Sequence, residues 1–232
     1  MPTLPFNALA NSHHARAAWE LSHISQPDTS LVVLPQPLNA AAKAYVEGLD
    51  YTALRHGRHA NHYASDPVSC FYFVWHEGSR HRDEMTGHDF AEGNLTCDYL
   101  RTVMPRTTGS EDFFADVALR VRQFENATGS TSLRCELRYS EAEMPHEFFH
   151  QDTNNGRYRA GTAYLNRATG FIAPEHLAGK RLNTAQVCPT QPDIAPHIIE
   201  PGLHDLYLFR VNRPHCVPRT AAPRFTLIMG AV

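Results

Sequence analysis

The period of the hydrophobic pattern changes at Gly129, and this change restricts the folds open to the chain more than any other feature. Residues 110–128 predict a helix, with Ser110 placed to cap it and acidic residues in its first turn. Its apolar side chains recur at helical spacing, at Phe113, Phe114, Val117, Val121 and Phe124. After Gly129, apolar residues alternate with polar ones at Leu133, Cys135, Leu137 and Tyr139. Alternation with a period of two is typical of a strand that is buried on one face.

Several short strand-like segments follow this first one. They are RYRAGTAYLN, GFIA, HDLYLFRV and PRFTLIMG, separated by Gly, Pro and Asn. Because short strands with turn signals and no helices between them are typical of antiparallel sandwiches and barrels, we expect a β-rich C-terminal half.

The first half of the chain is mixed. Residues 8–24 and 38–49 have helix-favouring composition, SCFYFVW up to Trp75 predicts a buried strand, and residues 77–109 predict a loop. We therefore expect an α+β protein with a mainly β core. Residues 1–129 would form a helical N-terminal elaboration that packs on the core, and residues 130–232 the core itself, within one compact domain.

Charge and composition argue against several kinds of partner. The formal net charge is −3, and Lys and Arg are scattered, unlike in a general nucleic-acid binder. No apolar segment reaches the 18 or so residues that a membrane-spanning helix needs, and the N-terminus lacks the features of a secretory signal. The five cysteines include no C-x-x-C pair, which suits reduced thiols. We expect a cytoplasmic protein that binds neither nucleic acid nor membranes.

His150 and Asp152 are candidate metal ligands. They lie two residues apart in FHQDTNNGRYRAGTAY, and residues i and i+2 of an extended strand face the same side. A third ligand from elsewhere would complete a set of two histidines and one carboxylate, which occupies one face of an octahedral iron and leaves positions open. Farther along, His215 opens a turn and Arg224 enters the last strand, where a guanidinium is suited to bind the distal carboxylate of a diacid.

These segments resemble the iron(II)/2-oxoglutarate-dependent dioxygenase superfamily, and prolyl hydroxylases in particular. HQDTNNGRYRAGTAYLN looks like the metal-binding strand pair of that family, and GFIAPEH is similar to a short strand that ends in Pro-Glu. The closing strands are matched by IIEPGLHDLYLFRVNRPHCVPRTAAPRFTLIMG. The likeness covers residues 130–232.

The resemblance implies a double-stranded β-helix, or jelly-roll barrel, with supporting N-terminal helices. It implies that His150, Asp152 and His215 bind Fe(II), that Arg224 pairs with the C5 carboxylate of 2-oxoglutarate, and that Tyr164 donates its hydroxyl to that carboxylate. The implied activity is hydroxylation of a C–H bond of a small molecule, an amino acid or a peptide side chain. The reaction would consume O₂ and 2-oxoglutarate and release succinate and CO₂.

Two stretches depart from the family pattern. Thr169-Gly170 stands where the family usually has a Gly-Gly pair, and the Pro-rich residues 176–197 look like an insertion. Both lie where a substrate would be shaped, so the substrate does not follow from the resemblance. Arg157 and Arg159 are candidate substrate contacts or, alternatively, solvated charges on a strand.

Two other interpretations remain open. His146-Glu147-Phe148-Phe149-His150 spells H-E-x-x-H, which on a helix would bind zinc with Glu147 as general base and Glu175 as a third ligand. The Asn154-Asn155-Gly156 sequence would end such a helix within about two turns. A non-catalytic, cupin-like binding barrel could use the same metal ligands, but it would not need Arg224 and Tyr164 as a clamp for a diacid.

Overall fold

A computed structural model describes most of the chain. The described residues are 20–55, 61–62, 68–76, 81–82, 89–90, 95–130, 132–140, 148–152, 156–217 and 222–231. None of the helices in these ranges is long and apolar enough to span a bilayer.

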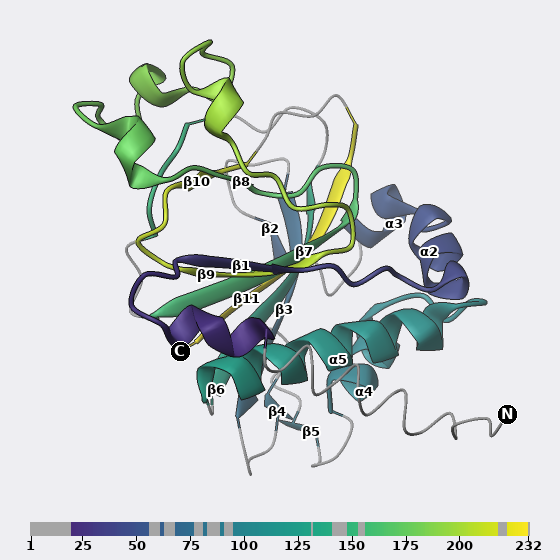
Figure 1. Cartoon of the computed structure of the whole chain (residues 1–232). Helices are drawn as coiled ribbons and strands as arrows, with labels where there is room; N and C mark the ends of the chain where they lie inside the picture. Colours follow the sequence, from purple (N-terminus) through teal and green to yellow (C-terminus); the bar gives the residue numbers. More distant parts are fainter. Residues whose placement is uncertain are drawn as a thin grey trace, which may run out of the picture.

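Two antiparallel sheets form the β part of the protein (Figure 1). In the major sheet the strand order is β1-β9-β7-β11-β6-β3-β4-β5, with β2 paired to β3; the minor sheet pairs β10 with β8. The strands of the major sheet are β1 (Leu31–Leu34), β2 (Asn61–His62), β3 (Val68–His76), β4 (His81–Arg82), β5 (Asp89–Phe90), β6 (Ser132–Ser140), β7 (Tyr158–Leu165), β9 (Leu206–Arg210) and β11 (Arg224–Ala231). The minor strands are β8 (Gly170–Phe171) and β10 (His215–Cys216).

From β6 onward, successive segments alternate between the two sheets. β6, β7, β9 and β11 are neighbours in the major sheet. The segments between them lie in the minor sheet, where His150 pairs with His215, β10 with β8, and Phe171 with Ile199. This alternation is that of a double-stranded β-helix, so the predicted fold class is confirmed. The strand predicted at 69–75 is present as β3, and the strands predicted in the C-terminal half are all present.

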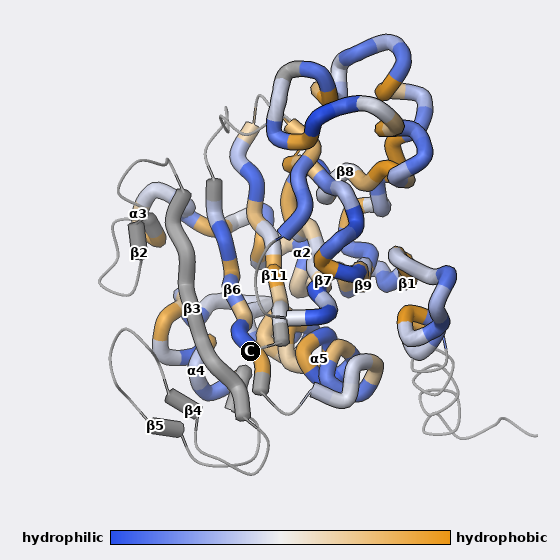
Figure 2. Tube along the Cα trace, turned by 90° about the vertical axis from the view of Figure 1, so that its left-hand side faces the viewer, coloured by the Kyte–Doolittle hydropathy of each residue, from blue (hydrophilic) through white to orange (hydrophobic). Residues whose placement is uncertain are grey.

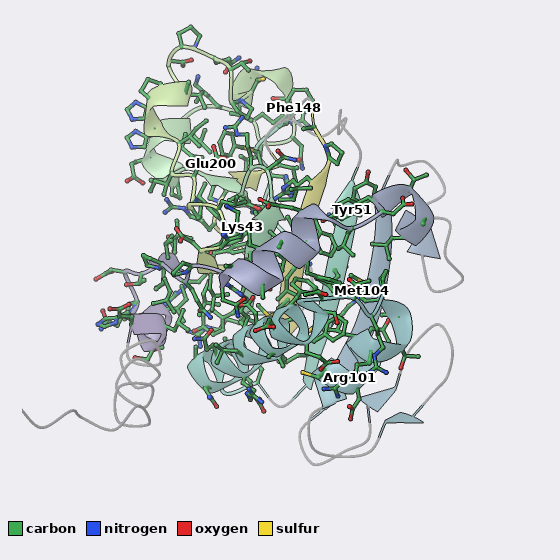
Figure 3. All side chains as sticks on the ribbon, turned by 90° about the vertical axis from the view of Figure 1, so that its right-hand side faces the viewer. Lys43, Tyr51, Arg101, Met104, Phe148 and Glu200 are labelled. Atoms are coloured by element: carbon green, nitrogen blue, oxygen red, sulfur yellow. The ribbon has the colours of Figure 1, made fainter. Side chains whose placement is uncertain are left out.

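Helices cover one face of the major sheet. They are α2 (Ala40–Glu47), α3 (Tyr51–Arg55), α4 (Leu95–Val103) and α5 (Ser110–Thr128). Seen from the side, the segments that carry Phe148 and Glu200 lie at one end of the molecule, and the helices near Arg101 and Met104 at the other (Figure 3). The major sheet therefore separates a helical layer from the minor sheet (Figure 1).

Hydrophobic and hydrophilic residues alternate along β6 (Figure 2), so its side chains are divided between the two faces of the major sheet. Its apolar residues and those of β11 pack against α5 in one core. The core residues of these three elements are Leu133, Cys135, Leu137, Tyr139, Phe225, Leu227, Met229, Phe113, Phe114, Val117, Val121 and Phe124, each at most 5% exposed. The other face of the same strands carries polar and charged residues, because neighbours in a strand point to opposite faces.

Two predictions about the helices were wrong. Residues 77–109, expected to be a loop, contain α4, whose apolar residues at helical spacing (Cys97, Tyr99, Leu100, Val103) are buried against the core. Ser110 is not a cap but the first residue of α5, after Gly109. Gly109 adopts a φ of 82°, and a Cβ there would lie 2.2 Å from the backbone oxygen of Ala41, so the close approach of α2 requires glycine.

The predicted end of α5 and the helix predicted at 38–49 are confirmed. Gly129 ends α5 in the left-handed conformation, and its N–H donates to the Glu125 carbonyl at 2.8 Å. The helix expected at 38–49 is α2, and residues 20–25 are helical, whereas residues 8–19 lie outside the described ranges. The division of the chain at residue 129 stays a prediction; strands from both sides of it share the major sheet.

Arg120, which is fully buried, joins α5 to the major sheet and to the segment before α2. Its Nε donates to Asp116 Oδ2 at 2.6 Å, its Nη1 to Thr162 Oγ1 at 3.0 Å and to the His204 carbonyl at 2.8 Å. Its Nη2 donates to the Gln36 carbonyl at 3.1 Å. One guanidinium therefore satisfies polar groups from four parts of the chain.

We expect Arg120→Ala to lower the free energy of unfolding by about 3–5 kcal/mol, because it removes the guanidinium that binds several buried acceptors and neutralises the Asp116 carboxylate. Urea unfolding would measure the change. Arg122→Ala, on the exposed side of the same helix, is the matched control and should change stability by less than about 0.5 kcal/mol. Equal losses in the two variants would contradict a structural role of Arg120.

Candidate metal centre

The structure brings together the three residues predicted as metal ligands. His150 and Asp152 lie on the segment before β7, and His215 begins β10. Their ligand atoms lie within 4.8 Å of one another. The backbones of His150 and His215 exchange two hydrogen bonds of 2.9 Å, which holds the imidazoles side by side with ring centroids 4.3 Å apart. The pairing of the minor sheet therefore sets the distance between the two histidines.

Each imidazole is also oriented through its Nδ1 atom. Nδ1 of His215 lies 2.9 Å from the Arg213 carbonyl, and Nδ1 of His150 lies 3.3 Å from the Phe148 carbonyl. A carbonyl accepts a hydrogen bond from the Nδ1–H tautomer, which leaves the Nε2 lone pair for a metal.

Residues 176–197 support this segment from outside. They contain two short 3₁₀ helices, η3 (Ala185–Val187) and η4 (Ala195–His197), and the end of a third, η2 (Pro174–Leu177). Phe149, next to His150, donates its N–H to the Val187 carbonyl and accepts from the N–H of Asn183. Phe149 is also fully buried in a small apolar cluster with Val187 and Ile194. Residues 183, 187 and 194 thus brace the segment that carries two of the candidate ligands.

The electrostatics of the site suit a divalent cation. Burial and the neighbouring His150 lower the pKa of His215 to about 4, so its imidazole is neutral and able to act as a ligand at pH 7. Asp152 Oδ2 is buried, 3.5 Å from His215 Nε2 and 3.2 Å from Arg159 Nε. Among the described residues it has no partner with hydrogen-bond geometry. A buried carboxylate oxygen without a hydrogen bond is costly, and a bound cation would satisfy it. Two imidazoles and one carboxylate form a donor set that fits iron.

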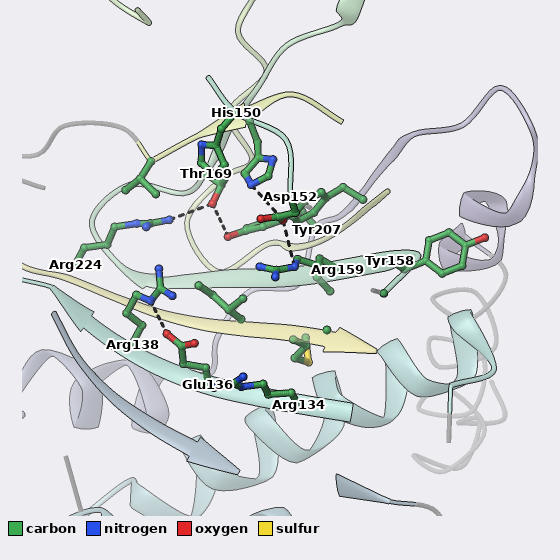
Figure 4. Close-up of a pocket in the computed structure, with 18 residues that line it drawn as sticks. Arg134, Glu136, Arg138, His150, Asp152, Tyr158, Arg159, Thr169, Tyr207 and Arg224 are labelled. Carbon is green, nitrogen blue, oxygen red and sulfur yellow. Dashed lines mark hydrogen bonds and ion pairs between the residues drawn. The ribbon is translucent and has the colours of Figure 1, made fainter. Parts of the chain in front are cut away.

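The three residues face a pocket of about 610 Å³ between the two sheets (Figure 4). At one end of this pocket lies Arg224, which is 2% exposed. Its Nε donates to the Arg167 carbonyl at 2.8 Å and its Nη2 to Thr169 Oγ1 at 3.2 Å, and Thr169 Oγ1 lies 3.0 Å from the Tyr207 hydroxyl. Burial lowers the pKa of Arg224, and Tyr207 opposes this shift. Arg224 therefore lines one end of the pocket, and its binding of a diacid stays a prediction.

Tyr207 is a residue of this site that the sequence did not predict, and neither did it predict the contact of Thr169 with Arg224. Thr169 stands where the family usually has glycine, and its hydroxyl links Arg224 to Tyr207. Tyr207 fits because residue 161 is glycine: a Cβ there would lie 2.5 Å from the Tyr207 hydroxyl. The signal available in the sequence was the alternation in HDLYLFRV, which places Tyr207 on the face opposite the buried Leu206 and Leu208.

The predicted role of Tyr164 is corrected by the structure. Its hydroxyl donates to Asp116 Oδ2 on α5 at 2.8 Å, and its ring packs against Phe113. It lies on the helix-covered face of β7, and it is not among the residues that line the pocket. The physical reason is parity: Tyr164 follows Arg159 by an odd number of residues on one strand, so the two side chains point to opposite faces.

The two arginines after Asp152 have different positions. Arg159 lines the pocket, with Nε 3.2 Å from Asp152 Oδ2. Arg157 is exposed, and its guanidinium lies over the ring of Tyr158 at 5.2 Å. Arg159 is therefore placed to act at the site, whereas Arg157 fits the alternative of a solvated charge.

The described backbone does not support the zinc-peptidase alternative. His146 and Glu147 lie outside the described residues, but Phe148 and Phe149 are not helical, and His150 pairs with His215 in the minor sheet. Glu175, the candidate third ligand, is exposed on η2 and does not belong to the group of converging ligands.

Comparison with solved structures supports the predicted resemblance at the level of the fold. A prolyl hydroxylase from Trichoplax adhaerens, in complex with a hypoxia inducible factor oxygen degradation domain peptide fragment, matches with a TM-score of 0.56. The match covers 99% of this chain and 94% of that chain, at 12% sequence identity.

Two bacterial structures are more distant. A prolyl-4-hydroxylase from Pseudomonas putida has a TM-score of 0.45 and 13% identity, over 93% of this chain and 97% of that chain. An oxidoreductase of the 2OG-Fe(II) oxygenase family from Burkholderia pseudomallei has a TM-score of 0.44 and 16% identity, over 94% and 88%. No family model matches the sequence, and no curated protein matches it.

Proposed function

We propose that the protein is a non-haem Fe(II)/2-oxoglutarate-dependent dioxygenase that hydroxylates a C–H bond of a small molecule, an amino acid or a peptide side chain. The observation that carries the proposal is that His150, Asp152 and His215 converge on the pocket into which the buried Arg224 points. The double-stranded β-helix, shared with the prolyl hydroxylase structure, is consistent with it. The cytoplasmic location expected from the sequence stays a prediction.

In this proposal His150, Asp152 and His215 hold Fe(II), which when bound would supply the activation of O₂ and the oxidative decarboxylation of 2-oxoglutarate. Arg224 binds the distal carboxylate of 2-oxoglutarate through its charged donors, and Thr169 and Tyr207 keep the guanidinium in place. A metal ligand set alone would also suit a binding barrel. The buried arginine, whose burial is costly without an anionic partner, favours the oxygenase.

Apolar side chains near the candidate ligands limit the access of water. The rings of Phe171 and Phe209 lie with their centroids 6.1 Å and 4.9 Å from that of His215. Both phenylalanines are at most 4% exposed. A dry surface on one side of the ligands strengthens the electrostatic interactions of the site.

Anaerobic titration of the Fe(II)-loaded protein with 2-oxoglutarate tests the proposal. We expect a weak visible charge-transfer band that saturates at one 2-oxoglutarate per protein, because the cosubstrate chelates a metal with open positions. Succinate in place of 2-oxoglutarate is the control and should give no band. A non-catalytic metal-binding barrel or a zinc peptidase would give no such band, and that outcome would reject the oxygenase.

A further inference from the structure

One wall of the pocket is formed by a row of charged side chains on β6. Arg134, Glu136 and Arg138 occupy alternating positions of that strand, so they face the same side, and all three line the pocket. Figure 4 shows them along β6, on the side of the pocket away from His150 and Asp152. The proposed metal site and the proposed cosubstrate site do not use them.

Glu136 and Arg138, the inner two residues of this row, are largely buried and bind each other. Glu136 is 8% exposed, and its Oε1 accepts from Arg138 Nε at 2.5 Å, which fixes the direction of that guanidinium. Arg138 is itself only 23% exposed in its side chain. Arg134, by contrast, is exposed. The row thus begins at the exposed Arg134 and ends at Arg138, which is half-buried and oriented. Charged side chains that are only solvated on a strand face are not held in one orientation in this way.

The charges of Arg138 and Arg224 interact. It pairs in register with Thr226 of β11, two residues from Arg224 and on the same face. After burial, the charge of Arg138 contributes to lowering the pKa of Arg224. Two guanidinium groups that approach the same half-buried space repel each other, and an anion between or beside them relieves the repulsion.

The charge balance of the pocket points the same way. Its charged lining residues, among those described, are the arginines Arg134, Arg138, Arg159 and Arg224 and the carboxylates Glu136 and Asp152. These four positive and two negative groups leave two positive charges. Fe(II) and the 2-oxoglutarate dianion would cancel each other, so the same excess would remain in the loaded site.

Resting on the proposed function, we propose that the substrate is a small organic anion, and that Arg134 and Arg138 bind its oxyanion group, a carboxylate or a phosphate. Glu136 binds Arg138 through its Nε, and we expect the Nη atoms of this guanidinium to donate to the oxyanion. Arg134, at the exposed end of the row, attracts the anion from solution. The pocket of about 610 Å³ lies in the size range of sites for small molecules.

Inorganic sulfate is a probe for this subsite because it is an oxyanion and a weak ligand of Fe(II). Sulfate would be titrated by calorimetry into anaerobic protein saturated with Fe(II) and 2-oxoglutarate, at constant ionic strength, so that Arg224 is already occupied. We expect saturable binding of one sulfate, and a loss of sulfate affinity of at least about tenfold in Arg134→Gln and in Arg138→Gln. Arg122→Gln, on the exposed face of α5, should bind sulfate like the unaltered protein.

Acetate and methyl phosphate, titrated in the same way, distinguish the two kinds of oxyanion. The tighter of the two identifies the group that the substrate carries. Thermal unfolding of each variant shows whether the fold is retained, and the double variant Arg134→Gln/Arg138→Gln gives the value without the subsite.

Three results would overturn the proposal. The first is the absence of saturable sulfate binding, and the second is equal sulfate affinity in the unaltered protein and the double variant. The third is a loss of 2-oxoglutarate affinity in Arg138→Gln that equals its loss of sulfate affinity. The last result would assign Arg138 to the cosubstrate. Binding of Fe(II) and 2-oxoglutarate is measured before sulfate is added, so failure of the proposed function appears separately, as the absence of that earlier binding.

Discussion

Asp152→Ala should reduce 2-oxoglutarate-dependent succinate formation to background, because the variant loses the only carboxylate among the converging ligands that the structure describes. We expect the affinity for Fe(II) to fall more than about 100-fold, since removal of groups that merely support metal ligands already costs 10- to 100-fold. Fe(II) binding, followed by competition with a coloured chelator, and succinate release would measure the two effects. Thermal unfolding would show that the variant is folded although Arg159 has lost its partner.

Two other carboxylates provide controls that also separate the rival functions. Glu175→Ala removes an exposed carboxylate on η2 and should leave Fe(II) affinity and turnover unchanged. Glu147→Gln should likewise leave an oxygenase largely active. A zinc peptidase would lose its activity in both variants, because Glu175 would be its third ligand and Glu147 its general base. Wild-type turnover in Asp152→Ala would contradict the assignment of the metal ligands.

Arg224→Lys should raise the dissociation constant of 2-oxoglutarate about 100-fold and leave Fe(II) affinity unchanged. Lysine keeps the positive charge but lacks the planar fork that now donates to the Arg167 carbonyl and to Thr169 while facing the pocket. Loss of a charge-assisted hydrogen bond costs about 1.5–3 kcal/mol, which corresponds to about 10- to 150-fold in affinity. The anaerobic titration with 2-oxoglutarate measures the change directly.

Two tyrosines on opposite faces of the major sheet provide a further comparison for the binding of 2-oxoglutarate. Tyr207→Phe removes the hydroxyl next to Thr169 and should weaken 2-oxoglutarate binding by about tenfold. Tyr164→Phe removes a hydroxyl that binds Asp116 on the helix side, so it should lower stability without changing 2-oxoglutarate affinity. If Arg224→Lys weakens Fe(II) and 2-oxoglutarate binding equally, Arg224 has a structural role instead.

The fold could be predicted to a large extent from local patterns. The alternation after Gly129 predicted the strands, because a strand buried on one face must place apolar residues at every second position. The helical spacing of apolar residues predicted α5 for the corresponding reason. α4 was missed because its apolar residues are few and lie within a polar stretch, and their burial depends on packing against the core.

Part of the candidate site followed from the sequence as well. The spacing of His150 and Asp152 predicted a shared direction, and the place of Arg224 in the last strand suited the binding of a diacid. The resemblance to a family implied His215 as the third ligand. The same resemblance misplaced Tyr164, because a likeness between spaced residues does not determine which face of a strand a side chain occupies. Thr169 and Tyr207 were missed because their contacts join segments that are distant in the chain.

The sequence by itself determined the periodicity, and hence which residues of each strand face the core and which face the opposite side. Only the tertiary structure decided which of those opposite faces meet. The pairing of His150 with His215 brings the candidate ligands together. The pairing of β6, β7, β9 and β11 in one sheet places arginines from three strands around one pocket. The physical reason is that alternation is a local property of the backbone, whereas the convergence of charged groups depends on non-local strand pairing, which must offset their desolvation and mutual repulsion.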